Sequence, residues 1–158
     1  MKKRIYLETS FISYLVSEKQ TRDMVIEANK QITREWWIKR KNDFELFISE
    51  FVIQEAKKGD SNASNKRILL LETLPILAAT EEVLQLSEKF LRSKIIPKKA
   101  AQDSVHISIS TIHGMDYLLT WNCTHIANAE IQKSINKICV TEGFEMPIIC
   151  TPFELMGD

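Results

Sequence analysis

Short apolar runs alternate with longer amphipathic segments along this chain, and the alternation predicts its fold. The apolar runs are rich in β-branched, aromatic and aliphatic residues and lie between polar segments, as strands do. They cover residues 4–7, 44–48, 74–78, 117–120 and 147–150. Strands that alternate with helices pair in parallel and are covered on both faces. We therefore expect an α/β fold, a three-layer α/β/α sandwich with a parallel central sheet.

The segments between these runs have apolar residues at helical intervals and capping signals at their ends. The longest, residues 21–41, places Trp36 toward the core. Trp37 then lies about 100° round the helix, where it covers a partner surface or lies partly under a loop. Residues 60–65 are polar and are expected to form a loop between the two halves. Further helices are expected at residues 10–16, 49–58, 66–72, 80–92, 98–113 and 126–139.

The composition is that of an ordinary globular protein, with 44% hydrophobic and 27% charged residues. A chain of 158 residues is expected to form a single domain spanning residues 1–158. No apolar run approaches the roughly 18 residues that cross a bilayer, and the N-terminus lacks the apolar core of a signal peptide. We expect a cytoplasmic protein with no membrane association.

Charge and cysteine usage restrict the partner and metal chemistry. The formal net charge is zero, so a nucleic-acid partner must be held by a local patch and not by global attraction. The cysteines, Cys123, Cys139 and Cys150, are odd in number and lack metal-binding spacing. We interpret them as reduced thiols without a metal or disulfide role.

Polar side chains follow the ends of the predicted strands. Glu8 comes directly after the first strand, and Asn122 comes two residues after the fourth. Glu55 lies six residues past the second strand, roughly 9 Å along its helix and within reach of the strand end. The carboxyl ends of parallel strands meet at one edge, where ligands of open α/β sheets bind. We expect these side chains to share that edge.

Asp103 joins them from a helix. Residues 98–113 lead into the fourth strand, so this helix runs antiparallel to the sheet and its first turns lie over the carboxyl edge. Each residue also has a purely structural interpretation. Glu8 is then a solvated strand-end acid and Glu55 a solvated helix acid, Asp103 complements a helix dipole, and Asn122 caps a helix that begins at His125.

Carboxylates that cluster repel one another unless a cation lies among them. Hard oxygen ligands in an open cluster suit Mg²⁺ or Mn²⁺, which keep several waters and bind phosphate oxygens. Such a site activates water and stabilises the in-line displacement of a phosphodiester oxygen. The pattern therefore predicts a divalent-metal site formed by Glu8, Glu55, Asp103 and Asn122.

Four short motifs, taken in order, carry a family resemblance. They are Tyr6-Leu7-Glu8-Thr9-Ser10, Ile48-Ser49 followed by Glu55, Asp103-Ser104-Val105-His106-Ile107, and Leu118-Leu119-Thr120-Trp121-Asn122. Together they resemble the motifs of PIN domains, most closely those of the VapC-type toxin branch of bacterial toxin–antitoxin systems. The resemblance implies a Mg²⁺- or Mn²⁺-dependent endoribonuclease that cleaves RNA, forms a homodimer and is inhibited by a cognate antitoxin protein. It also implies that Ser10 and Thr120 support the acids.

Two positions depart from the common PIN pattern. Glu8 stands where that pattern has Asp, which moves its carboxylate outward by ~1.5 Å, about one C–C bond. Asn122 stands at the fourth acid position, where it offers a neutral carbonyl oxygen and cannot act as a general base. These departures indicate a variant subgroup. They also leave open a PIN-fold protein that has lost catalysis and acts as a binding or assembly module. An unrelated small-molecule or phospho-receiver module is disfavoured, because the chain lacks a glycine-rich phosphate loop.

The histidines and nearby lysines add less. His113 lies in the last turn of its helix, where a cation suits the dipole. His106 lies one helical turn after Asp103, and we expect a half-buried structural residue there in preference to a bond to Asp103. His125 follows Asn122 closely enough to approach the site. Lys98 and Lys99 lie beside Asp103. They either contact a phosphate or are simply solvated residues at the start of the helix.

Overall fold

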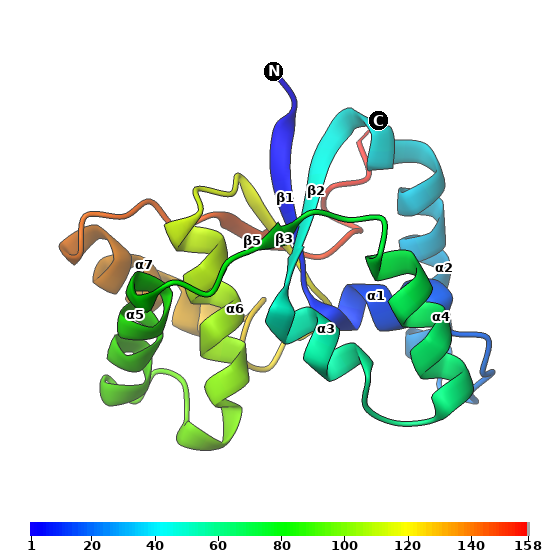
Figure 1. The fold of residues 1–158 in the computed structure, drawn as a ribbon, viewed down its shortest axis with the longest axis horizontal. Helices are drawn as coiled ribbons and strands as arrows, with labels where there is room; N and C mark the ends of the chain where they lie inside the picture. Colours follow the sequence, from blue (N-terminus) through cyan, green and yellow to red (C-terminus); the bar gives the residue numbers. More distant parts are fainter. Residues whose placement is uncertain (158) are drawn as a thin grey trace.

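The computed structural model describes residues 1–157, which form a parallel sheet with helices on both faces (Figure 1). The five strands that these residues form lie in the order β3-β2-β1-β4-β5, and every pairing is parallel. The strands are β1 (Lys3–Leu7), β2 (Phe44–Ser49), β3 (Ile76–Leu77), β4 (Tyr117–Leu119) and β5 (Ile148–Cys150). The predicted three-layer α/β/α sandwich is confirmed.

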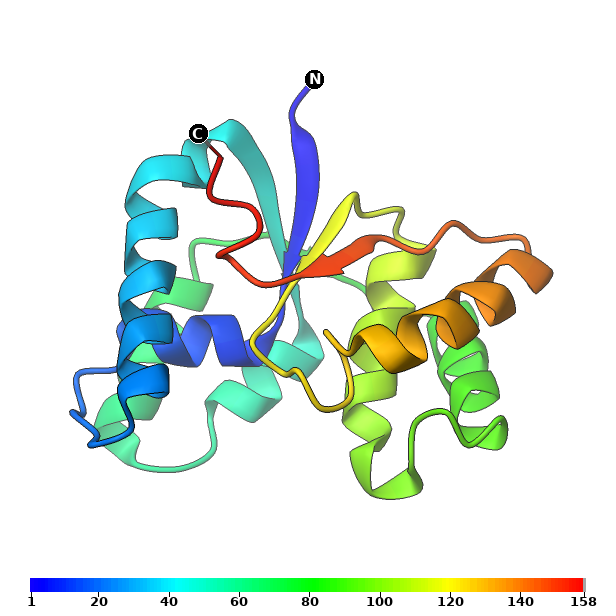
Figure 2. The same ribbon diagram turned by 180° about the vertical axis from the view of Figure 1, so that it is seen from behind.

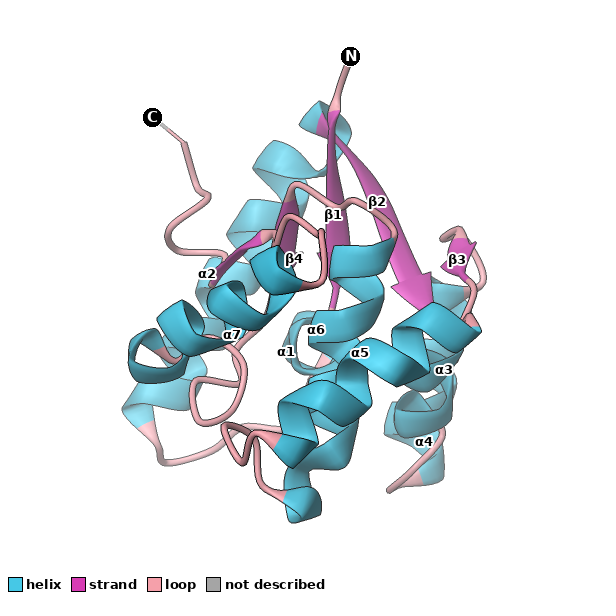
Figure 3. Ribbon diagram, turned by 90° about the vertical axis from the view of Figure 1, so that its left-hand side faces the viewer, coloured by secondary structure: helices cyan, strands magenta, loops and turns pink. Residues whose placement is uncertain are grey.

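Two groups of helices enclose the sheet (Figures 1 and 3). One group contains α1 (Thr9–Val16), α2 (Met24–Arg40), α3 (Glu50–Ala56) and α4 (Ser61–Leu71). The other contains α5 (Glu81–Arg92), α6 (Ala101–Ile112) and α7 (Ala129–Thr141). Short 3₁₀ turns, η1 (Lys41–Asp43) and η2 (Lys98–Ala100), precede β2 and α6. The helices thus cover both faces of the sheet.

The core is centred on β1, the middle strand. Ile5, Tyr6 and Leu7 are fully buried. On the α2 side, Trp36 is also fully buried and its ring contacts Phe11. The segment that follows β5 returns along α2 (Figure 2). The indole Nε1 of Trp36 donates a hydrogen bond to the main-chain carbonyl of Leu155 in this segment. Because β1 is buried on both faces, Glu8 emerges from a rigid support at the strand's end.

Several boundaries differ from the expectation, each for a local reason. Helix α4 begins at Ser61, inside the stretch expected to be a loop, because Asp60 caps it through a bond from the Ala63 amide. Strand β3 is limited to two residues after Pro75. Helix α7 begins at Ala129 and is capped by Asn128, so the expected start at residue 126 was too early.

Removing the cap of α4 tests this correction. We expect Asp60→Ala to lower the free energy of unfolding by about 1 kcal/mol, because the Ala63 amide loses its acceptor. Urea unfolding measures the change. Asn62→Ala, an exposed position in the first turn of the same helix, is the control and should change little. Equal effects of the two substitutions would contradict the capping role.

The cysteines are free thiols, as the sequence suggested. Burial raises the pKa of Cys139 to about 11 and that of Cys150 to about 12, so both stay protonated at neutral pH. Cys123 is exposed. Separately, no helix among residues 1–157 combines the length and apolar character needed to span a membrane.

Candidate metal centre

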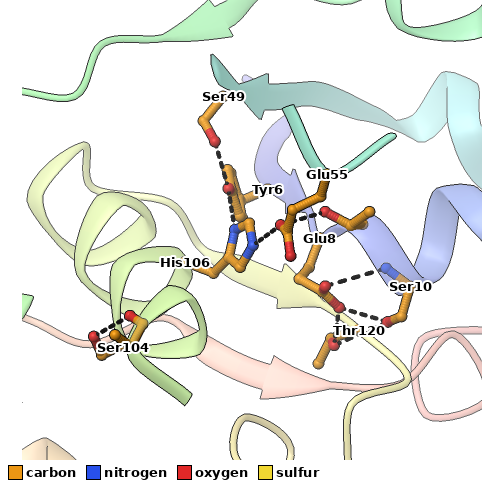
Figure 4. Close-up of polar contacts among 10 residues, drawn as sticks. Tyr6, Glu8, Ser10, Ser49, Glu55, Ser104, His106 and Thr120 are labelled. Atoms are coloured by element: carbon orange, nitrogen blue, oxygen red, sulfur yellow. Dashed lines mark hydrogen bonds and ion pairs between the residues drawn. The ribbon is translucent and has the colours of Figure 1, made fainter. Parts of the chain in front are cut away.

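Glu8 lies at the junction of β1 and α1, where it is the N-cap of the helix (Figure 4). Its Oε2 accepts a hydrogen bond from the Ser10 amide at 3.1 Å. Its Oε1 accepts bonds from the hydroxyls of Ser10 and Thr120, each at 2.5 Å. Thr120 directly follows β4, the neighbour of β1 in the sheet. Ser10 and Thr120 therefore support the acid as the resemblance implied, and Glu8 is only 5% exposed.

Glu55 approaches from α3, which begins where β2 ends. Its Oε1 accepts a hydrogen bond from the Thr9 hydroxyl at 2.8 Å and one from Nε2 of His106 at 2.5 Å. Its side chain is 21% exposed. No hydrogen bond from the described residues reaches Oε2 of Glu55, so one of its two oxygens is free for a ligand.

His106 is the residue of this cluster that sequence reasoning missed. The expectation that this histidine is half-buried was wrong, because the side chain is fully buried, and it is directed at Glu55. Its Nδ1 is hydrogen-bonded to the Tyr6 hydroxyl at 2.6 Å, and that hydroxyl to Ser49 Oγ at 2.7 Å (Figure 4). One feature of the sequence could have indicated this role of His106. It lies one helical turn after Asp103, and so on the same face of α6 as a residue expected at the carboxyl edge.

The structure brings two of the four predicted residues together. One ligand atom from each of Glu8, Glu55 and His106 lies within 4.8 Å of the other two. Asp103 does not belong to this group. Its Oδ2 lies 3.2 Å from Nδ1 of His125, and the two side chains are 19% and 26% exposed. They form a more accessible pair on the α6 side.

Asn122 is also used elsewhere. Its Oδ1 accepts hydrogen bonds from the amides of Thr124 at 3.2 Å and His125 at 3.1 Å. It therefore caps a turn, as the structural interpretation proposed, although α7 itself starts later. Its role as a fourth ligand stays a prediction.

Burial and charge act in opposite directions on this cluster. Burial alone would lower the pKa of His106, but the bond to Glu55 and the charges of Glu8, Glu55 and Asp103 outweigh it, and the pKa is raised above 6.5. Burial alone would raise the pKa of Glu55, but His106 and Thr9 outweigh it, and the pKa is lowered below 4.5. The pKa of Tyr6 is raised well above 10 by burial, so its phenol stays protonated. Within residues 1–157, neither Glu8 nor Glu55 forms an ion pair with Lys or Arg.

These shifts predict a pH dependence of stability. The His106 contribution is fully present below pH 6.5 and is lost as the pH rises through the raised pKa. The Glu55 contribution is present above pH 4.5 and is lost as the pH falls through the lowered pKa. The interaction of His106 with Glu55 therefore stabilises the fold most between pH 4.5 and pH 6.5. Urea unfolding in EDTA should show a loss of this contribution above pH 6.5 in the wild type.

His106→Gln should remove that part of the pH dependence. The control is His113→Gln, because the His113 imidazole is only partly buried and contacts the carbonyl of Ala78 instead of a carboxylate. Identical pH profiles for wild type and His106→Gln would contradict the assignment.

No family model and no curated protein matches this chain. Among solved structures, the chain is similar to one in the crystal structure of VapBC2 from Rickettsia felis bound to a DNA fragment from their promoter. The match covers 94% of this chain and 98% of that one, with 14% sequence identity and a TM-score of 0.53. The similarity is one of fold, and it confirms the PIN-like α/β fold that the motifs implied. The variant subgroup stays a prediction.

Proposed function

We propose that this protein is a divalent-metal-dependent endoribonuclease that hydrolyses RNA phosphodiester bonds. The observation that carries the proposal is the approach of the Glu8 and Glu55 carboxylates at the carboxyl edge of the sheet. Among the described residues, His106 is the only ion-pair partner of Glu55, and Glu8 has none. Two carboxylates this close, with so little compensating charge, favour a bound cation.

The donor set fits Mg²⁺ or Mn²⁺. Carboxylate oxygens are the ligands these ions prefer, and Glu8 and Glu55 would hold the ion. The hydroxyls of Ser10, Thr120 and Thr9 fix the two carboxylates without neutralising them. The negative charge of the site is thus preserved for a cation.

The surrounding residues suit a phosphodiester substrate. A bound Mg²⁺ or Mn²⁺ lowers the pKa of water and offsets the charge of phosphate oxygens. His125 is held by Asp103 at 3.2 Å and is partly exposed, and it would donate a hydrogen bond to a phosphate oxygen. Lys98 and Lys99 are exposed in η2, just before Asp103, and supply positive charge for the RNA backbone.

The biological setting we propose is that of the toxin in a type II toxin–antitoxin pair in the cytoplasm. The fold similarity to a chain of the VapBC2 crystal structure and the motif resemblance support this role. The partners would be an antitoxin protein and a second copy of the chain.

A second candidate function is a PIN-fold binding or assembly module without catalysis. The positions of Asp103 and Asn122 favour it, because one pairs with His125 and the other caps a turn, which leaves two of the four expected groups at the cluster. Metal binding and cleavage distinguish the two functions.

The test combines calorimetric titration with Mn²⁺ and cleavage of a single-stranded RNA. We expect Mn²⁺ to bind, cleavage to require it, and EDTA to stop the reaction. Asp103→Ala should reduce cleavage, and the control Glu130→Gln, an exposed first-turn acid on α7, should not. The gain of charge in Asn122→Asp should raise the rate if that charge limits it. RNA cleavage that survives Asp103→Ala would count against a role of the Asp103–His125 pair in the reaction. Failure to bind millimolar Mn²⁺ would favour the binding module.

A further inference from the structure

A buried histidine, His106, joins the two acids in one cluster, and its surroundings are those of a ligand. We infer that Nε2 of His106 coordinates the ion together with Glu8 and Glu55, so that the centre has mixed nitrogen and oxygen ligands and selects Mn²⁺ over Mg²⁺. The inference rests on the proposed function only in requiring that a divalent ion binds at this cluster.

The first support is the position of the ring. The imidazole is fully buried, and Nε2 lies 2.5 Å from Glu55 Oε1. Glu8 completes the cluster, in which one ligand atom from each of the three residues lies within 4.8 Å of the other two. An ion bound by both carboxylates therefore has this nitrogen as its neighbour.

The second support is the fixation of the other ring nitrogen. Ligating histidines usually donate that N–H to a fixed acceptor, which sets the tautomer and the ring orientation. Nδ1 of His106 lies 2.6 Å from the Tyr6 hydroxyl, which is itself hydrogen-bonded to Ser49 at 2.7 Å. All three side chains are fully buried. In the structure described, Nε2 donates to Glu55. An ion bound at the cluster would take the place of that Nε2 proton, while the N–H of Nδ1 would stay bonded to the Tyr6 hydroxyl.

The third support is the engagement of the other two expected ligands. Asp103 is paired with His125, and Asn122 accepts two amide hydrogens of its own turn. The donors that converge among residues 1–157 are therefore two carboxylates and one imidazole. Imidazole is a poor ligand for Mg²⁺ and a good one for transition-metal ions, which predicts the selectivity.

Pulsed EPR of the protein loaded with Mn²⁺ alone tests the coordination directly. The wild type should show ¹⁴N modulation from a directly bound nitrogen, and labelling with ¹⁵N-histidine should abolish the ¹⁴N pattern. His106→Gln, which offers an amide group at the position of Nε2, should lose the modulation. His125→Asn should retain it. Because the labelling experiment uses the wild-type sequence, the test holds even if the buried substitution prevents folding.

Calorimetry gives a second readout. His106→Gln should weaken Mn²⁺ binding by about tenfold or more and Mg²⁺ binding by clearly less. Tyr6→Phe should keep the ¹⁴N modulation and weaken Mn²⁺ binding by about tenfold, because the ring loses its fixed partner. Equal losses for the two ions in His106→Gln would overturn the selectivity.

The outcomes separate this inference from the proposed function. Mn²⁺ that binds without ¹⁴N modulation, or with modulation that His125→Asn removes, overturns the histidine ligand and leaves a carboxylate centre intact. Failure of Mn²⁺ to bind at all overturns both.

Discussion

Replacing Glu8 with glutamine is expected to abolish the thermal stabilisation that Mn²⁺ gives the wild type and to lower RNA cleavage by about a hundredfold or more. The Glu8 carboxylate is a proposed metal ligand whose position is fixed, because it accepts hydrogen bonds from Ser10 and Thr120. The amide keeps the shape and removes the charge that holds the cation. Differential scanning fluorimetry with and without Mn²⁺, and RNA cleavage rates, measure the two effects.

The same substitution should not destabilise the metal-free protein. Removing one of two neighbouring carboxylates relieves their repulsion, and the hydroxyls of Ser10 and Thr120 can rotate to accept bonds from the new amide. Glu45→Gln, an exposed substitution of the same kind on β2, should behave as the wild type in both assays. A Glu8→Gln protein that is stabilised by Mn²⁺ as strongly as the wild type would contradict the proposed ligand.

Trp36→Ala is expected to lower the free energy of unfolding by about 3–5 kcal/mol, the largest effect on stability that we predict. Its ring is fully buried and packs edge-on against Phe11 at 5.5 Å and stacked on Phe44 at 5.8 Å. Its indole N–H also donates to the carbonyl of Leu155 at 3.0 Å, tying the C-terminal segment to α2. Urea unfolding measures the loss, which is large compared with the usual total stability of a domain.

The neighbouring tryptophan is a matched control on the same helix. Trp37 is only partly buried, packing against Phe11 at 6.3 Å with the Lys41 amine over its ring at 4.9 Å. Trp37→Ala should therefore cost clearly less than Trp36→Ala, although both change helix propensity equally. Trp36→Phe should fall between them, because it keeps most of the apolar contact and loses the bond to Leu155. Equal losses at Trp36 and Trp37 would contradict the assignment of the core face.

The proposed centre differs from a purely acidic one in the charge that surrounds it. Glu8 and Glu55 are supported by hydroxyls. Among the described residues, Glu55 pairs with the imidazole of His106 and Glu8 forms no ion pair. A divalent ion would therefore compete with a protonated histidine for Glu55. The acidity of the medium and the metal concentration should act together on the occupancy of such a site.

The fold followed closely from local patterns. Strand runs and helical spacing depend on residues that are neighbours in the sequence, so the order of elements and the parallel sheet were predicted correctly. Errors arose where a side chain redefined a boundary, as Asp60 did for α4 and Asn128 for α7. Such caps compete closely with loop conformations of the same polar residues, and the pattern alone does not separate them.

The sequence by itself determined that Glu8 and Glu55 lie at the carboxyl edge of a parallel sheet, because strand direction and helix length fix the positions of their backbones. Only the tertiary structure decided which side chains meet there. It joined His106 to Glu55, 51 positions away, and paired Asp103 with His125. The physical reason is that these contacts depend on how α6 packs across the sheet and on side-chain rotamers chosen by that packing, which local periodicity does not encode.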